Sequence, residues 1–277
     1  HHFPTPCTIS KSLHPRPVCL SPDGSPVSAV TIIYMFFPLK VCRENAILYG
    51  ENCKNNFHFT ERVDIIMRIC KAKNYDEMSR QAANVISAQV IMNQTACLVW
   101  LPVLLPWHLQ AADRLENKGD LDFSGVKTVN LDEYKGLTKE NDQSYYYFMY
   151  NNLFKHINID LKEQNIPDGT EPDSAIGAPA TNRVIDDIGG IDLQLLGIGH
   201  NGHIGFNEPD SEFAKMTHCV DLTESTIDKK RFFASIDDVP DRRYTMGIKT
   251  IMQAKTILLI ASGADKPASS AKLSVAL

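Results

Sequence analysis

Leu193 to Pro209 read LQLLGIGHNGHIGFNEP, and most of the architecture can be worked out from this segment. Its first six residues are almost continuously apolar and of strand length, as expected for a strand buried on both faces of a parallel sheet. The remainder concentrates glycine, histidine, asparagine and glutamate directly behind that strand. Ligands of open α/β sheets bind beyond the carboxyl ends of the strands, so the segment predicts a central strand followed by a functional site.

The same pattern of an apolar run followed by a polar cluster recurs on both sides of this segment. VKTVNL (Val126–Leu131) is an expected strand that ends at DEYKGL, and TILLIA (Thr256–Ala261) is another that ends at SGADK. MRICKA (Met67–Ala72) has the length of a further short strand. The polar clusters are expected to meet at one edge of the sheet.

Helices are expected between these strands. Asn74 or Asp76 can cap a helix whose apolar positions recur every three to four residues, and Ser144 opens an aromatic helix, SYYYFMYNNLFKHI. Short apolar strands that alternate with helices predict an α/β fold, here a Rossmann-like open, mostly parallel sheet with helices on both faces.

The bulk composition excludes several classes of partner. The 277 residues carry a net charge of −5, whereas a nucleic-acid partner usually demands a basic face. Val27–Leu39 and Ala96–Leu109 are apolar but shorter than the roughly 20 residues that span a bilayer. The seven cysteines are scattered without CxxC pairs, which fits neither a disulfide framework nor a zinc site. We therefore expect a cytoplasmic protein with no nucleic-acid or membrane partner.

The loop behind the central strand holds a candidate acid–base pair. His203 and Glu208 stand five residues apart, a spacing that lets a carboxylate orient an imidazole for proton transfer near neutral pH. A structural turn with a surface histidine is the alternative, and the density of polar residues and glycine disfavours it. A metal site at His200 and His203 lacks an evident third ligand.

Two further sets of charges stand at expected strand or helix ends. Asp132 or Glu133 becomes a base if neighbouring aliphatic and aromatic groups desolvate it, and is otherwise part of a solvated acidic turn. Lys266, at the start of an expected helix, and Arg231 are suited to binding a phosphate. Each of these two cations, taken alone, is more often a surface charge.

Together these motifs resemble the glucosamine-6-phosphate deaminase family. The similarity extends over most of Met67–Lys266 and is carried by VNLDEYKGL, SYYYFMYNNLF, LQLLGIGHNGHIGFNEP, THCVDLTEST with RFF after it, YTMGIKTIM and ILLIASGADK. The FNEP ending of the loop separates this family from the 6-phosphogluconolactonases, which share its fold.

The resemblance implies an aldose–ketose isomerisation that expels ammonia and converts glucosamine 6-phosphate and water to fructose 6-phosphate. The resemblance also suggests classification as a hydrolase. Asp132 matches the base that moves a proton between C2 and C1, and His203 matches the residue that opens the ring. The other expected site residues are Asn201 and Glu208 around the imidazole, Glu133 and Gly202 at the substrate, and Arg231 and Lys266 at the phosphate.

The resemblance implies no metal and no organic cofactor, since a positioned acid–base pair suffices for an enolisation. Asn201 cannot exchange a proton, so we assign it an orienting role. The partner is a small-molecule sugar phosphate, and a homo-oligomer is left open. Two other functions compete with the deaminase: a non-catalytic sugar-phosphate-binding protein, and a 6-phosphogluconolactonase-like hydrolase.

One segment departs from the family pattern at the place where a loop resembling GLATGSTP would bind phosphate. Cys97–Pro106 instead read CLVWLPVLLP, which puts Trp100 and several leucines at the expected mouth of the site. With allowed codons this segment can be written TGC TTG GTA TGG CTA CCG GTT CTA CTC CCN. Reading from one base before the Leu98 codon gives LGMATGSTP. We infer a frameshift that is restored near Leu115 and that impairs the phosphate loop.

Three further stretches depart from the family. Residues 1–66 match nothing in it and are expected to be a poorly structured, non-native upstream extension. Residues 67–277 then form the deaminase-like α/β domain. AIGAPAT (Ala175–Thr181) breaks the family pattern, and the chain departs again after Lys266, which suggests a truncated C-terminus.

Overall fold

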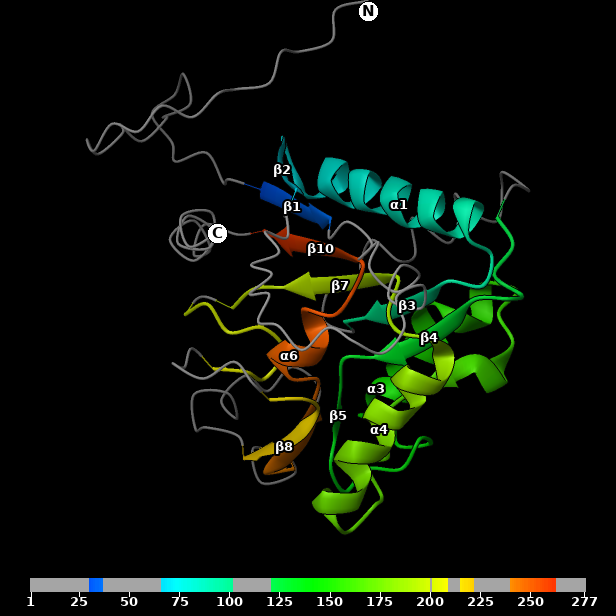
Figure 1. Cartoon of the computed structure of the whole chain (residues 1–277), viewed down its shortest axis with the longest axis vertical. Coiled ribbons are helices and arrows are strands. Elements are labelled where there is room, and N and C mark those ends of the chain that lie inside the picture. The colour runs from blue at the N-terminus through cyan, green and yellow to red at the C-terminus, as the bar shows by residue number, and fades with distance from the viewer. Residues whose placement is uncertain are drawn as a thin grey trace, which may run out of the picture.

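A computed structural model describes residues 30–36, 66–101, 121–199, 201–208, 215–221 and 240–262. Seven described strands form one sheet in the order β2-β1-β10-β7-β3-β4-β6 (Figure 1). The five strands from β10 to β6 run parallel, and β1 is antiparallel to both of its neighbours. The strands are β1 (Val30–Phe36), β2 (Ile66–Ala72), β3 (Cys97–Trp100), β4 (Lys127–Asn130), β6 (Gln164–Asn165), β7 (Leu193–Gly197) and β10 (Thr256–Ala261).

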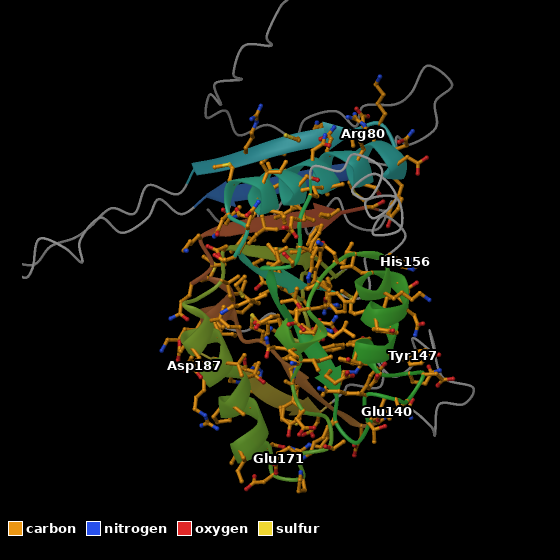
Figure 2. All side chains as sticks on the ribbon, turned by 90° about the vertical axis from the view of Figure 1, so that its right-hand side faces the viewer. Arg80, Glu140, Tyr147, His156, Glu171 and Asp187 are labelled. Atoms are coloured by element: carbon orange, nitrogen blue, oxygen red, sulfur yellow. The ribbon has the colours of Figure 1, made fainter. Side chains whose placement is uncertain are left out.

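Helices cover both faces of this sheet. On one face, alternate strand residues such as Leu98, Leu195 and Leu258 share an apolar cluster with α1 (Tyr75–Met92) and α3 (Tyr145–Asn152). On the other, the intervening residues pack with Ile185 of α4 (Ser174–Ile188) and Ile251 of α6 (Ile248–Ile251). Figure 2 shows α3 and α4 on opposite sides of the molecule. The predicted mostly parallel sheet with helices on both faces is confirmed.

The predicted caps of two helices are confirmed as well. The Asn74 side chain accepts a hydrogen bond from the Glu77 amide at 2.8 Å, and the Glu77 carboxylate accepts one from the Lys73 amide at 2.7 Å. Ser144 caps α3 by accepting a hydrogen bond from the Tyr147 amide at 3.0 Å. Each cap satisfies amides that the first helical turn leaves without a partner. Two short 3₁₀ helices follow α3, at Phe154–His156 and Leu161–Glu163.

A second, smaller sheet was not predicted. It contains β5 (Asp132–Tyr134), β9 (Arg242–Thr245) and β8 (His218–Asp221), all antiparallel, in the order β5-β9-β8. Only Leu131 separates β4 of the large sheet from β5 of the small one. Asp132 lies opposite Thr245, and Thr245 lies opposite His218, so these three residues share one face. The small sheet therefore begins at a candidate catalytic residue.

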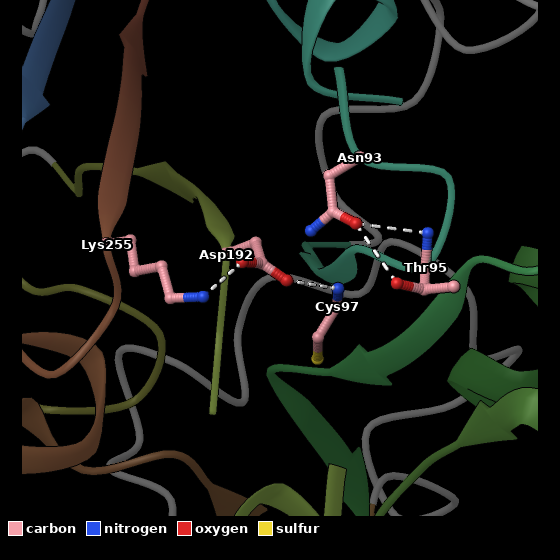
Figure 3. Close-up of polar contacts among 5 residues, drawn as sticks. All are labelled: Asn93, Thr95, Cys97, Asp192 and Lys255. Atoms are coloured by element: carbon pink, nitrogen blue, oxygen red, sulfur yellow. Dashed lines mark hydrogen bonds and ion pairs between the residues drawn. The ribbon is translucent and has the colours of Figure 1, made fainter. Parts of the chain in front are cut away.

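A polar cluster joins the amino ends of three neighbouring strands (Figure 3). The Asp192 carboxylate, just before β7, accepts a hydrogen bond from the Cys97 amide at 2.8 Å and lies 2.6 Å from the Lys255 ammonium. Beside it, the Asn93 side chain accepts hydrogen bonds from the amide and hydroxyl of Thr95. Burial raises the pKa of the Cys97 thiol to about 12, so this sulfur stays protonated. The cluster thus links the amino ends of β3, β7 and β10, at the edge of the sheet opposite to the predicted site.

The structure differs from the expectations for Val30–Phe36 and Trp100. Val30–Phe36 lies inside the stretch expected to be poorly structured, yet it forms β1; its β-branched and aromatic residues suit a strand. The upstream-extension assignment of residues 1–66 stays a prediction. Trp100, expected at the mouth of the site, is instead 3% exposed and packs in the cluster beneath α1 and α3. Ala175–Thr181 lies within α4, with Pro179 inside the helix.

Among the described residues, no helix has the length and apolar character of a membrane span.

Candidate active site

Two of the predicted site clusters meet at the carboxyl edge of the large sheet. Strand β7 leads into the loop of residues 199–208, and β4 leads through Leu131 into Asp132. Strand β3 lies between β7 and β4, so the chain leaves β3 between these two clusters. Arg231 and Lys266, the two residues predicted to bind phosphate, lie outside the described residues, as does His200 of the disfavoured metal site.

Within the loop, Asn201 connects His203 to Glu208. Its Nδ2 donates to Glu208 Oε2 at 2.6 Å, and its Oδ1 lies 2.7 Å from His203 Nδ1 and accepts from the His203 amide at 3.1 Å. A carboxylate only accepts, so the NH₂ group must face Glu208 and the carbonyl oxygen must face His203. The Nδ1 atom therefore carries a proton, and in the neutral imidazole Nε2 is the basic nitrogen.

Two glycines give this loop its shape. A Cβ atom on Gly199 would lie 2.2–2.5 Å from three atoms of the His203 ring, so the imidazole packs directly on the Gly199 backbone. Gly205 has a φ of +60°, and a Cβ there would lie 2.9 Å from Thr245 Oγ1. Both positions require a residue without a side chain. The predicted substrate residue Gly202 lies in the turn between these two glycines, and its amide donates to Gly199.

Hydrogen bonds to the small sheet and the residue after it hold this loop beside Asp132. The Phe206 amide donates to Thr245 Oγ1 at 3.1 Å, and the Asn207 side chain donates to the Met246 carbonyl at 2.9 Å. Thr245 is fully buried and pairs with Asp132 across β5 and β9. The loop that carries His203 is thus hydrogen-bonded to the strand adjacent to that of Asp132.

Asp132 is a buried carboxyl group with the properties of a base. It is 1% exposed, and its Oδ1 atom has no hydrogen-bond partner among the described residues. Burial raises its pKa from 3.8 to about 7; the Arg243 charge opposes this rise and the Glu133 charge adds to it. A carboxyl group with this pKa can accept and return a proton at neutral pH.

Glu133 has a different environment from its neighbour. Its carboxylate accepts hydrogen bonds from the amides of Tyr134, Tyr145 and Tyr146 at 2.8, 3.0 and 3.1 Å. Burial raises its pKa to about 7, and these three hydrogen bonds and Arg243 limit the rise. Two of these amides belong to the first turn of α3, where a carboxylate is also favoured by the helix dipole. The contacts of Glu133 are those of a helix cap.

Sequence interpretation missed Arg243, the only arginine or lysine in the buried polar set of the described residues. It is 5% exposed, and its guanidinium lies 3.6 Å from the ring centre of Tyr134 and 4.1 Å from that of Phe206. It donates to the hydroxyl of Tyr145 at 3.0 Å and to that of Tyr134. Nothing in DRRYT distinguishes Arg243 from Arg242, because only strand pairing decides which of them faces inward.

Comparison with known proteins establishes the family. The family model described as glucosamine-6-phosphate isomerases/6-phosphogluconolactonase matches residues 106–275. The chain belongs to this family. A family member from Lachnoclostridium phytofermentans, named glucosamine-6-phosphate deaminase, is 50% identical over 210 residues, which cover 72% of this chain and 86% of that protein.

Solved structures of the family reproduce the fold. A protein described as a monomeric glucosamine-6-phosphate deaminase matches with a TM-score of 0.64 and 39% identity, over 67% of this chain and 78% of its own. The 6-phosphogluconolactonase from Trypanosoma brucei matches with a TM-score of 0.56 and 17% identity, over 71% and 82%. The second likeness shows the shared fold of the family alone.

Proposed function

We propose that this chain has the chemistry of a glucosamine-6-phosphate deaminase, converting glucosamine 6-phosphate and water to fructose 6-phosphate and ammonia. The observation that carries the proposal is the connection of two proton-transfer groups through one residue: Thr245 pairs with Asp132 and binds the amide of Phe206 in the His203 loop. The name and 50% identity of the L. phytofermentans relative support the same reaction.

Asp132 acts as the base of the isomerisation. Its carboxylate takes the proton from C2 of the open-chain sugar and returns it to C1, while O1 gains a proton from the ammonium group; water then adds to the resulting imine at C2, which releases ammonia. A pKa of about 7 suits both halves of this transfer, since a group that is half ionised at neutral pH gives and takes protons readily. The reaction is a deamination coupled to an isomerisation, so hydrolase is not an apt class for it.

His203 opens the sugar ring by exchanging a proton with the ring and anomeric oxygens. Because Nδ1 is held by Asn201 Oδ1, the exchange uses Nε2. Asn201 orients the ring, and Glu208 acts through Asn201, from whose NH₂ group it accepts a hydrogen bond. His203 therefore transfers the proton, Asn201 orients the imidazole, and Glu208 holds Asn201 in place.

Phosphate binding is the remaining function of the site. We assign this role to Arg231 and Lys266, following the family resemblance. The family's phosphate loop would follow β3, between the His203 loop and Asp132. In this chain that place begins with Leu101 and Pro102, and prolines at 102 and 106 supply no N–H donor. We propose that the frameshifted segment weakens phosphate binding and lowers turnover in this chain.

We infer a small-molecule partner and a cytoplasmic location. The net charge of −5 supports the absence of a nucleic-acid partner, and the free thiols of Cys70, Cys97 and Cys219 are consistent with a reducing compartment. A homo-oligomer is an alternative to the monomeric state of the solved relative.

Ammonia release and calorimetric binding together separate the deaminase from its competitors. Both are measured with glucosamine 6-phosphate, on this chain and on a loop-restored chain in which LGMATGSTP replaces Leu98–Pro106. We expect little ammonia from the former and clear turnover from the latter. Binding without ammonia release in both chains would favour the non-catalytic sugar-phosphate-binding protein. Hydrolysis of 6-phosphogluconolactone by the loop-restored chain, without ammonia release, would favour the lactonase.

A further inference from the structure

Arg243 contacts both segments that carry the proposed catalytic residues. Tyr134, whose ring lies 3.6 Å below the guanidinium, is two residues after Asp132 on β5. Phe206, whose ring lies 4.1 Å away, is three residues after His203 in the loop. One side chain from β9 thus lies between the segment of the base and the segment of the imidazole.

The contacts suit arginine better than lysine. The planar guanidinium stacks on aromatic rings and donates at its edge to the hydroxyls of Tyr134 and Tyr145. Lysine has a compact ammonium that cannot stack in this way, and methionine has no donor. The geometry therefore depends on the shape of the side chain as well as on its charge.

The charge of Arg243 lies among ionisable groups from several elements. On the same face of the small sheet, Asp132 lies diagonally across from Arg243, and His218 of β8 stands beyond Thr245. The remaining groups on which the Arg243 charge acts are Glu133 and Tyr134 on β5 and Tyr145 on α3. Burial and the Arg243 charge act in opposite directions on the pKa of both Asp132 and Glu133.

We propose that Arg243 is a positioning residue of the active site, which clamps the loop carrying His203 to the strand carrying Asp132 and places a fixed positive charge beside the base. The proposal rests on the functions assigned above to Asp132 and His203. It makes Arg243 act through these residues, without contact to the substrate.

Two substitutions separate the charge of Arg243 from its shape. Arg243→Met removes the charge and should raise the pKa of Asp132 by about one unit or more, followed by ¹³C NMR of the aspartate carboxyl carbons. Arg243→Lys keeps the charge, so this pKa should stay near its original value. Both variants should speed hydrogen exchange at the Phe206 amide, because both lose the stacked guanidinium. Arg242→Met is the matched control: Arg242 pairs with exposed Asp221, and neither measurement should change.

The same variants in the loop-restored chain give the functional measurement. Arg243→Met should move the acid limb of the kcat profile upward by the shift seen in the carboxyl pKa, and Arg243→Lys should lower kcat without moving that limb. An unchanged Asp132 pKa in Arg243→Met would overturn the charge effect, and unchanged Phe206 exchange in both variants would overturn the clamp. If Arg243→Met does not fold, hydrogen exchange at the Phe206 amide and kcat, both measured on Arg243→Lys, still decide whether Arg243 clamps the loop. Absence of ammonia release from the unsubstituted loop-restored chain would refute the proposed function, while the NMR result still tests Arg243.

Discussion

The Nδ1 nitrogen of His203 lies 2.7 Å from the Oδ1 oxygen of Asn201. Both Glu208 and Asn201 were expected to orient the imidazole. In the structure the Asn201 amide stands between the imidazole and Glu208, with its NH₂ group 2.6 Å from the carboxylate. A neutral group thus selects the tautomer of the imidazole, and the negative charge acts from one residue further away.

Substitution of Asn201 tests this arrangement. In the loop-restored chain, Asn201→Ala removes the acceptor for Nδ1–H, so the tautomer is no longer fixed, and kcat should fall by about 10-fold or more. Asn201→Asp keeps the acceptor but sets two carboxyl groups within hydrogen-bond distance, and such a pair shares a proton. Asn201→Asp should therefore retain more activity than Asn201→Ala and change the pH profile of kcat. Equal activity in Asn201→Ala and the parent would remove the orienting role.

Replacement of His203 should affect the ring-closed substrate selectively. His203→Gln cannot exchange a proton with the ring oxygen, so kcat/KM for the pyranose form should fall by about 100-fold or more. An acyclic analogue that needs no opening should lose far less. Glu208→Gln should show a milder form of the same bias, because Glu208 acts through Asn201. A loss of equal size on both substrates would contradict ring opening by His203.

Gly199→Ala should displace the imidazole without any change in the acid–base residues. The added Cβ would lie 2.2–2.5 Å from ring atoms of His203, so the ring must move. We expect kcat to fall about 10-fold or more, since a displacement of about 1 Å can cost 100-fold. A double-mutant cycle with His203→Ala provides the control, because Gly199→Ala should cost little once the ring is gone. Additive losses would show that Gly199 acts on something other than the imidazole.

The two buried carboxyl groups predict how stability depends on pH. Asp132 and Glu133 have pKa values raised from 3.8 and 4.5 to about 7, so the folded state holds protons that the unfolded state has lost. The contribution of these two groups to the free energy of unfolding is fully present below about pH 4 and is lost as pH rises through about 7. Urea denaturation of this chain should therefore show a free energy of unfolding that falls between pH 4 and 8.

Asp132→Asn supplies the control for that measurement, because an amide does not titrate, and the slope should become smaller. Asp122 and Asp168 have lowered pKa values from local hydrogen bonds, so their contribution changes below this pH range. Stability that rises from pH 5 to 7 would contradict the raised pKa values.

Strands β2, β4, β7 and β10 of the large sheet could be predicted because their signals are local, whereas β1, β3 and β6 were not predicted. Apolar runs such as Leu193–Gly197 and Thr256–Ala261 form central strands almost wherever they occur in an α/β chain, and Ser144 has the side chain that caps a helix. The clustering of Asp132 with the His203 loop also follows from the parallel sheet, since carboxyl ends of parallel strands share one edge.

The small sheet and its consequences depend on tertiary contacts. HCVD and RRYT are short and mixed in polarity, so neither has a periodicity that marks a strand. The inward position of Arg243 follows from its pairing with Tyr134, and no property of the sequence around it indicates that pairing. The position of Asn201 between two charged or basic side chains likewise depends on how the loop closes over Gly199.

The most direct test of the role of Asp132 is ammonia release from glucosamine 6-phosphate by the loop-restored chain and by its Asp132→Asn variant. Asn has nearly the shape of Asp but cannot accept the C2 proton, so the variant should remain folded and lose activity by about 10²–10⁴-fold. Circular dichroism and thermal unfolding of both proteins provide the control for folding. Near-equal ammonia release from the two proteins would contradict the assignment of Asp132 as the base.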